Sequence, residues 1–152
     1  MGKAVKKEPI VSALQQYQDR FRSVVDAASA FENHDTQGQK LLYAALEQVF
    51  EFGEEIRQDA PAFESFLEVH GKTLNKVTKD NPYNALIELA FAGNRSKSWR
   101  SEISNVLRLA SDINVKESLS QWLEAGGGIS GRYEEAVDHF ARPATTKAQK
   151  LR

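Results

Sequence analysis

The residues of this sequence best suited to chemistry are basic side chains gathered in residues 71–108. This stretch carries seven lysines and arginines against three acidic residues. Its densest segment, 95–100, reads Arg-Ser-Lys-Ser-Trp-Arg. Cationic and hydroxyl groups are what proteins use to contact phosphates, and an exposed indole can stack on a base. The predicted nucleic-acid contacts are Lys72, Lys76, Lys79, Arg95, Lys97, Arg100 and Arg108.

The same stretch has a plainer interpretation, as a solvated basic surface without a ligand. Trp99 shares a helical face with Ile103 and Val106, which predicts that its ring packs in the core instead of stacking on a base. A basic cluster alone does not establish nucleic-acid binding. Both interpretations therefore stay open at the level of sequence.

A second candidate surface is acidic and lies on the helix expected over residues 41–59. Residues 26–70 carry a net charge of −8, and the acidic side chains lie opposite the apolar stripe of this helix. Such a face could imitate nucleic-acid charge or occupy a basic groove, as expected of a phage or plasmid inhibitor. It could also pair with the basic face of a second copy of the chain. The candidate protein-binding residues are Glu47, Glu51, Glu54 and Glu55.

The most unusual stretch is Gly126–Gly131, with four glycines and a serine before an expected helix start. Backbone N–H groups, the helix dipole and a nearby arginine could together hold a phosphate. It is not a Walker A loop, because no Gly-Lys-Ser/Thr follows. The favoured interpretation is a tight turn between two helices, for which glycine is suited. The candidate anion-binding residues are Gly127, Gly128, Ser130 and Arg132.

The three histidines, His34, His70 and His139, form no metal-binding or catalytic motif. Neither an HExxH pair nor a Glu-x-x-His pair occurs in the chain. Glu135 and His139 are four residues apart and are expected to hydrogen-bond on one helix face. Two ligands are too few for a metal site. We therefore predict no metal, no cofactor and no catalytic residue.

Residues 109–123 resemble a helix-turn-helix motif in the spacing of Ala110 and the turn residue Asn114. The apolar residue of the second helix, Leu119, comes one position early, and Lys116 is the one base in that segment. A helix that reads DNA needs donors for base edges and phosphates. We interpret this segment as two helices joined by a turn.

The elements that must position these residues are helices. Apolar residues recur at helical spacing along nearly the whole chain, and strand-like alternation is absent. The sequence predicts one all-α domain over 9–142, a compact bundle of about seven helices with short loops. Basic, flexible ends are expected over 1–8 and 143–152.

Proline, glycine and capping residues set the expected helix boundaries. Residues 72–80 are expected to form an irregular loop, and the helix over 83–92 is expected to be central because it is apolar on most sides. The boundary residues are Pro9, Asp35 or Thr36, Asp59 or Ala60 with Pro61, Gly71, Asn81 with Pro82, Gly93, Ser96 or Ser98, Gly126, Ser130 and Pro143. The predicted core is Leu14, Phe21, Leu42, Val49, Phe52, Phe66, Leu86, Leu89, Phe91, Trp99, Ile103, Val106, Leu107 and Trp122.

Composition narrows the class of protein further. The chain has no cysteine, which excludes disulfides and thiol chemistry and favours a cytoplasmic location. No apolar run approaches the ~18–20 residues that cross a membrane. The sequence therefore predicts a non-enzymatic binding module, associated with nucleic acid through residues 72–108. The alternative is a protein-binding module that acts through the acidic helix.

Overall fold

A computed structural model gives the fold of the chain. It describes the backbone of residues 2–32, 38–91 and 95–151, and the side chains of 13–31, 38–91 and 95–141. Over these residues the prediction of an all-α fold is confirmed, with eight helices and no strand. The helices are α1 (Gly2–Glu32), α2 (Gly38–Ile56), α3 (Ala60–Val69), α4 (Lys76–Asp80), α5 (Pro82–Ala90), α6 (Lys97–Asp112), α7 (Leu119–Ala125) and α8 (Gly128–Leu151).

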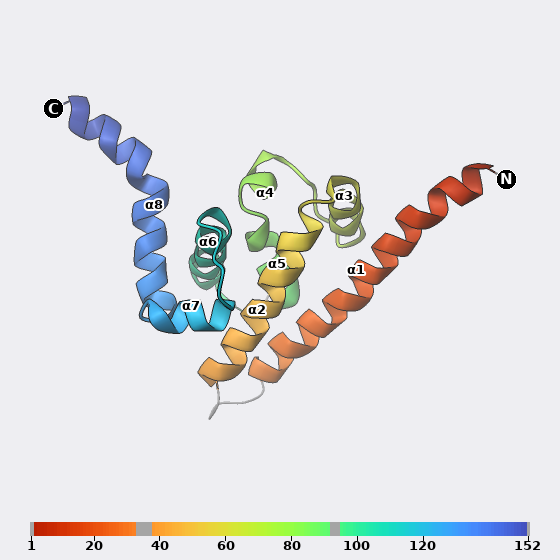
Figure 1. The fold of residues 1–152 in the computed structure, drawn as a ribbon, viewed down its shortest axis with the longest axis horizontal. Coiled ribbons are helices and arrows are strands. Elements are labelled where there is room, and N and C mark those ends of the chain that lie inside the picture. Colours follow the sequence, from red (N-terminus) through yellow and green to blue (C-terminus); the bar gives the residue numbers. More distant parts are fainter. Residues whose placement is uncertain (1, 33–37, 92–94, 152) are drawn as a thin grey trace.

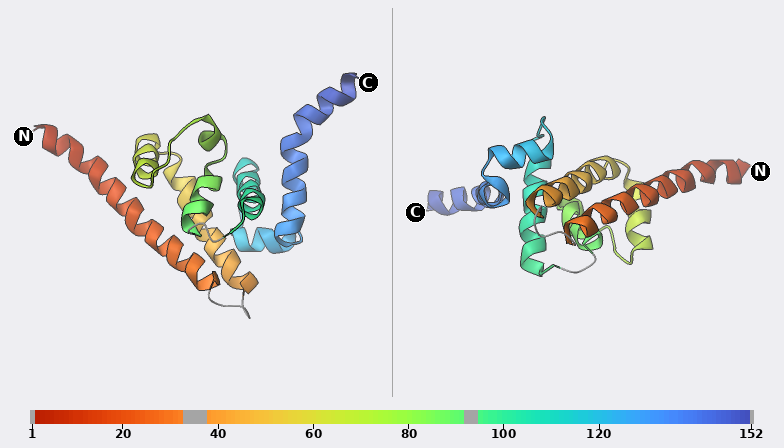
Figure 2. Two further views of the ribbon diagram at one scale, coloured as in Figure 1. Left: turned by 180° about the vertical axis from the view of Figure 1, so that it is seen from behind. Right: turned by 90° about the horizontal axis from the view of Figure 1, so that it is seen from below.

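The two longest helices, α1 and α8, flank the body of the protein on opposite sides (Figure 1). Helix α2 runs beside α1, and α3 packs against both of them. Helices α4, α6 and α7 lie between α2 and α8, and α5 packs against α2. The N-terminal part of α1 and the C-terminal part of α8 extend beyond the body in opposite directions, as the view from below in Figure 2 also shows. The two ends of the chain therefore lie on opposite sides of the body.

Helix α2 is the element against which most others pack. It contacts α1, α3, α5 and α7, and the residues it buries recur at the spacing of one helical face. The rings of Phe21 in α1, Phe52 in α2 and Phe66 in α3 meet with centroids 5.1 to 5.3 Å apart. Tilted and edge-to-face aromatic pairs at this separation stabilise a core beyond the area they bury. The cluster therefore holds α1, α2 and α3 together.

Most of the predicted core is confirmed. The buried members are Phe21, Val49, Phe52, Phe66, Leu86, Phe91, Ile103, Val106, Leu107 and Trp122. The half-buried members, which pack against the same core, are Leu14, Leu42, Leu89 and Trp99. Helix α5 is central as predicted, but its largest buried side chain, Tyr83, is absent from the predicted core. A tyrosine is buried completely only when its hydroxyl finds a partner, which the sequence does not reveal.

Several predicted caps are confirmed. Asp59 Oδ1 accepts a hydrogen bond from the backbone N–H of Ala62 at 3.3 Å, and Ser96 Oγ accepts one from that of Trp99 at 3.1 Å. Gly71 adopts a left-handed φ of 74° after α3, where glycine avoids the cost of a Cβ. The boundaries predicted at Asp35 or Thr36 and at Gly93 lie outside the described residues.

The predicted loop over 72–80 is wrong in its second half, since residues 76–80 form α4. Asn75 Oδ1 accepts from the backbone N–H of Thr78 at 2.9 Å, and this cap supports a helix too short to bury any residue. Asn81 occupies the cap position of α5 as predicted, but its side chain makes no cap bond. Its amide instead donates to Ser104 Oγ at 3.3 Å.

Three predicted helix ends are also wrong. Helix α1 begins at Gly2 instead of Pro9, and α8 begins at Gly128 instead of Ser130 and continues past Pro143. A proline inside a helix removes one hydrogen bond and bends the helix without necessarily ending it, and α8 changes direction along its length (Figure 1). The flexibility expected of residues 1–8 and 143–152 stays a prediction.

Helix α5 packs closely on α2 because position 53 is a glycine. A Cβ at Gly53 would lie 2.4 Å from Tyr83 Cε1 and 3.0 Å from Leu86 Cδ1. We expect Gly53→Ala to destabilise the protein by about 1–3 kcal/mol through overpacking, measured by urea unfolding. Gly38→Ala is the control, since its Cβ would meet only Phe31 at an ordinary 3.8 Å. Equal stability of the two variants would contradict this account.

Candidate nucleic-acid interface and polar groove

Glu88 on α5 brings together basic residues from two separate segments of the chain. Lys72 Nζ donates a hydrogen bond to Glu88 Oε1, and Arg100 Nη2 lies 3.9 Å from Glu88 Oε2. The Lys72 ammonium, aided by Arg100, holds the pKa of the Glu88 carboxyl below its usual range, although partial burial opposes the shift. The loop before α4 and the first turn of α6 therefore share one side of the molecule.

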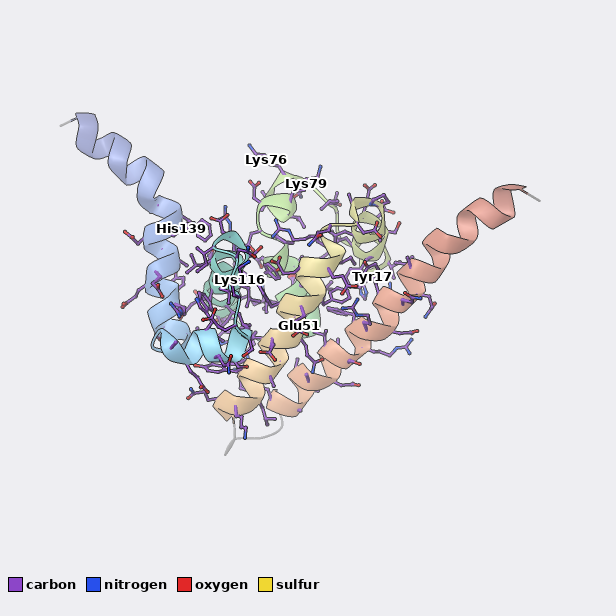
Figure 3. The ribbon with its side chains drawn as sticks, in the orientation of Figure 1. Tyr17, Glu51, Lys76, Lys79, Lys116 and His139 are labelled. Carbon is purple, nitrogen blue, oxygen red and sulfur yellow. The ribbon has the colours of Figure 1, made fainter. Side chains whose placement is uncertain are left out.

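Three further lysines surround this ion-pair cluster. Lys76 and Lys79 are exposed on α4 (Figure 3), and Lys97 is exposed at the start of α6. None of the three forms an ion pair with any described side chain. We call the set of Lys72, Lys76, Lys79, Lys97 and Arg100 the α4–α6 basic face. Its exposed ammonium groups keep their full charge available to a polyanion.

A shallow groove of about 310 Å³ runs along this face between α4 and α5. It is lined by amide and hydroxyl side chains, including those of Asn75, Thr78 and Asn84, together with Lys72 and Glu88. Uncharged donors of this kind contact phosphate and sugar oxygens in nucleic-acid complexes. The groove therefore adds uncharged hydrogen-bond donors to the lysines and the arginine of the α4–α6 basic face.

The arginines of the 95–100 segment are held by the protein itself. The Arg95 guanidinium lies over the rings of Phe31 and Trp99, at 4.7 and 5.1 Å from their centroids. Arg100 Nη1 donates to the Arg95 carbonyl at 2.9 Å. Trp99 packs edge-on against Phe91 with centroids 5.1 Å apart. The indole is thus half-buried against the core, on the side that its register predicted, and Arg95 lies over its ring.

Arg108 does not join the basic face. Its guanidinium lies 3.9 Å from the centroid of the Phe140 ring on α8, in a different concavity. This polar groove, about 640 Å³ in volume, lies between the ends of α2, α4 and α6 and the middle of α8. Its charged lining is Glu54, Arg57, Asp80, Arg108, Asp112 and His139.

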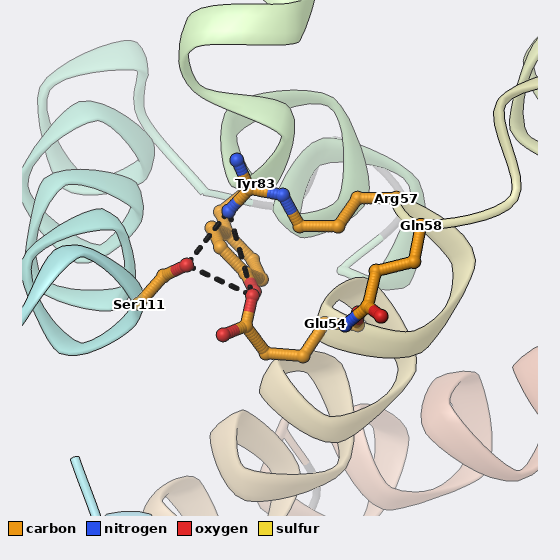
Figure 4. A network of polar contacts seen from close by, with 5 residues as sticks. All are labelled: Glu54, Arg57, Gln58, Tyr83 and Ser111. Carbon is orange, nitrogen blue, oxygen red and sulfur yellow. Dashed lines mark hydrogen bonds and ion pairs between the residues drawn. The ribbon is translucent and has the colours of Figure 1, made fainter. Parts of the chain in front are cut away.

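The polar groove is built around the Glu54 carboxylate (Figure 4). Glu54 Oε2 accepts from Tyr83 Oη at 2.7 Å and from Ser111 Oγ at 2.9 Å, and Arg57 Nη1 lies 3.4 Å away. Arg57 also donates to Ser111 Oγ at 2.7 Å. Burial, followed by the bond to Glu54, raises the pKa of the Tyr83 hydroxyl far above its ordinary value of 10.0. One oxygen of Glu54 thus fastens α2 to both α5 and α6.

Most carboxylates of the predicted acidic surface have partners within the chain. Besides Glu54, Glu47 Oε1 accepts from the backbone N–H of Ser120 at 3.2 Å, and Glu55 pairs with Arg20 at 2.8 Å. Glu51 alone of the four candidates is fully exposed without a partner among the described residues. The sequence treated this helix face as solvated, whereas three of its four acids stabilise contacts between helices.

The glycine-rich stretch forms a closely packed turn. Gly127 and Gly128 have left-handed φ angles of 85° and 76°, and Ser130 lies inside α8 instead of capping it. Arg132 Nε and Nη2 donate to the Trp122 carbonyl at 2.9 and 2.7 Å, and Nη1 contacts Glu135 at 2.7 Å. A Cβ at Gly126 would lie 2.0 Å from Arg132 Nε. These contacts favour a tight turn over an anion-binding site, because the Arg132 guanidinium already bonds to the Trp122 carbonyl and to Glu135.

The predicted Glu135–His139 pair does not form. Glu135 bonds to Arg132, while His139 Nε2 lies 2.5 Å from Asp112 Oδ2 on α6. Within the described part of the chain, no group of three or more acidic, histidine or cysteine side chains is arranged to hold a metal ion. The contact of His139 instead connects α8 to α6.

Comparisons with known proteins give no relative. No family model, no curated protein and no solved structure matches the chain. Among the residues that the structure describes, no helix is long and apolar enough to cross a membrane. The functional argument therefore rests on the geometry alone.

Sequence reasoning missed the residues that organise both sites. Glu88, Tyr83 and Ser111 lie on apolar or unremarkable stretches of the sequence, and each acts through a partner more than fifteen residues away. The one available signal was the isolated acid at Glu88 within the otherwise apolar helix 83–92. A charge in such a helix calls for a partner of opposite sign.

The Tyr83 hydroxyl can be tested by Tyr83→Phe, which keeps the buried ring. We expect a loss of about 1.5–3 kcal/mol at neutral pH, as for other bonds to charged acceptors, measured by urea unfolding. Because the Tyr83 pKa is raised in the folded state, its contribution is present below pH 10.0 and lost as the pH rises above it. Above pH 10.0, the free energy of unfolding of Tyr83→Phe should therefore fall less steeply with pH than that of the parent protein.

The matched control is Tyr43→Phe, which removes a buried hydroxyl that accepts from the neutral amide of Gln39 at 3.2 Å. We expect this change to cost less at neutral pH, about 0.5–1.5 kcal/mol. A Tyr83→Phe protein as stable as the parent would show that the Glu54 network does not stabilise the fold.

Proposed function

We propose that this protein is a non-enzymatic module that binds nucleic acid through the α4–α6 basic face. The proposal is supported above all by the convergence of Lys72 and Arg100 on Glu88. That contact places the basic segments 72–79 and 95–100 side by side, whereas basic blocks in a sequence need not meet in space.

The chemistry of the face favours contact with the phosphate backbone instead of base reading. Lys76, Lys79 and Lys97 are exposed point charges, and lysines bound to phosphates release condensed counterions. Trp99 is half-buried against the core, and the one arginine of this face, Arg100, is mostly buried beside Glu88 and so is poorly placed to recognise a guanine edge. The module is therefore proposed to bind without marked sequence preference.

The basic residues at the two ends of the chain are further candidate contacts for nucleic acid. Both carry an excess of basic residues. The ends of α1 and α8, which contain all of these basic residues except the last residue of the chain, project beyond the body (Figure 1). Basic segments of this kind track phosphates next to a folded domain. The basic residues of the two ends are Lys3, Lys6, Lys7, Lys147, Lys150 and Arg152.

The alternative, protein binding through the acidic helix 41–59, has less support. The contacts of Glu47, Glu54 and Glu55 within the chain leave Glu51 as the one candidate acid without a partner there. Nucleic-acid binding therefore remains the first proposal, with the cytoplasm as the proposed compartment. An origin in a phage or plasmid stays a prediction from the charge layout alone.

The basic face can be tested with the triple variant Lys76→Ala/Lys79→Ala/Lys97→Ala. Binding of mixed-sequence duplex DNA and single-stranded RNA is measured by fluorescence anisotropy across a salt series. For duplex DNA, each lost phosphate contact lowers the log–log salt slope by about 0.9, so the triple variant should lose about 2.7. Alanine is a good helix former, so α4 and α6 are expected to persist.

The control is Lys40→Ala/Arg108→Ala/Lys116→Ala, which removes the same formal charge away from the face. This variant should keep the salt slope of the parent protein. Equal losses in both variants would show a diffuse charge effect instead of a binding face. An absence of binding by the parent protein at low salt would reject the proposed function.

A further inference from the structure

The polar groove carries a second inference, independent of nucleic-acid binding. Four helices contribute to its lining, and its volume of about 640 Å³ lies within the range of sites that hold small ligands. The proposed basic face shares none of its residues. A failure of either idea therefore leaves the other standing.

Most charged side chains of the groove already have a polar partner. Glu54 pairs with Arg57 at 3.4 Å, and His139 lies 2.5 Å from Asp112. The two remaining charges, those of Arg108 and Asp80, have no ion-pair partner among the described residues. They are of opposite sign and line the same groove.

The remaining charges are held in place by their surroundings. The Arg108 guanidinium rests on the Phe140 ring at 3.9 Å, and this stacking leaves the N–H groups at its edge available to an acceptor. Asp80 is the last residue of α4, next to the Asn81–Ser104 hydrogen bond that ties this turn to α6. The hydrogen bonds to the Glu54 carboxylate from Tyr83, Ser111 and Arg57 all end on Oε2.

We propose that the groove binds a small zwitterion of the short-peptide class, with its carboxylate on Arg108 and its ammonium on Asp80. An arginine fork matches a carboxylate through two parallel hydrogen bonds. A purely anionic ligand would face the carboxylates of Glu54, Asp80 and Asp112. A purely cationic ligand would face Arg57 and Arg108.

The probe is triglycine, which carries both charges and no side chain. N-acetyl-triglycine lacks the ammonium, and triglycine amide lacks the carboxylate, so the pair separates the two contacts. Free glycine distinguishes a single amino acid from a short peptide. Binding to the full chain is followed by NMR, through the backbone amides of Asp80 and Asp112 and the Arg108 Nε–H.

We expect triglycine to shift these three signals in a saturable way, and each capped peptide to bind at least about tenfold more weakly. Arg108→Gln and Asp80→Asn should each weaken triglycine binding by a similar factor. The matched controls Lys116→Gln and Asp26→Asn, at exposed sites outside the groove, should leave it unchanged.

Four results would overturn the inference. The first is the absence of any saturable shift with triglycine. The second is binding of a capped peptide as tight as that of triglycine, which would show a simple anion or cation site. The third is unchanged binding in both groove variants. Tighter binding of glycine than of triglycine would also overturn it, since the ligand would then be a single amino acid.

Discussion

The close approach of α5 to α2 at Gly53 is the constraint on which the rest of the structure depends. Because position 53 has no side chain, the Tyr83 ring lies directly against α2, and its hydroxyl reaches Glu54 in the next position of that helix. The same carboxylate then accepts from Ser111 on α6. One missing methyl group thus allows a single acid to fix three helices.

Helix α5 links the two candidate surfaces through residues at its opposite ends. Near its start, Tyr83 is buried and bonds toward the polar groove, while near its end Glu88 collects Lys72 and Arg100. Tyr83 thereby holds the Glu54 carboxylate of α2 in place, and Glu88 holds the charged groups of Lys72 and Arg100. Apart from these two residues and the exposed Asn84, the helix is apolar and mostly buried, so Tyr83 and Glu88 connect the core to the surface.

The sequence predicts the parts of this fold that repeat a local rule. Apolar spacing locates the long helices and most of the core, and local side-chain geometry locates the caps at Asp59 and Ser96. The sequence does not predict α4, because no residue of this helix is buried and its apolar residues therefore show no helical spacing. It also predicts helix ends at prolines that α1 and α8 accommodate inside the helix. For the sites, it supplies the candidate lysines but not their partners. Glu54 appears solvated in sequence, and Glu88 appears unimportant, because contacts between distant segments decide both roles.

Contacts between distant segments also explain why a basic stretch of sequence is not equivalent to a basic surface. Of the predicted contacts, Lys72 and Arg100 share a carboxylate, while Arg95 and Arg108 lie over aromatic rings. The exposed charge falls to Lys76, Lys79 and Lys97. The first two lie on α4, which is held by the Asn75 cap and by contacts with α5 instead of by buried residues. Elements with few buried contacts open most readily. Two of the three exposed lysines of the basic face therefore lie on a helix with few buried contacts.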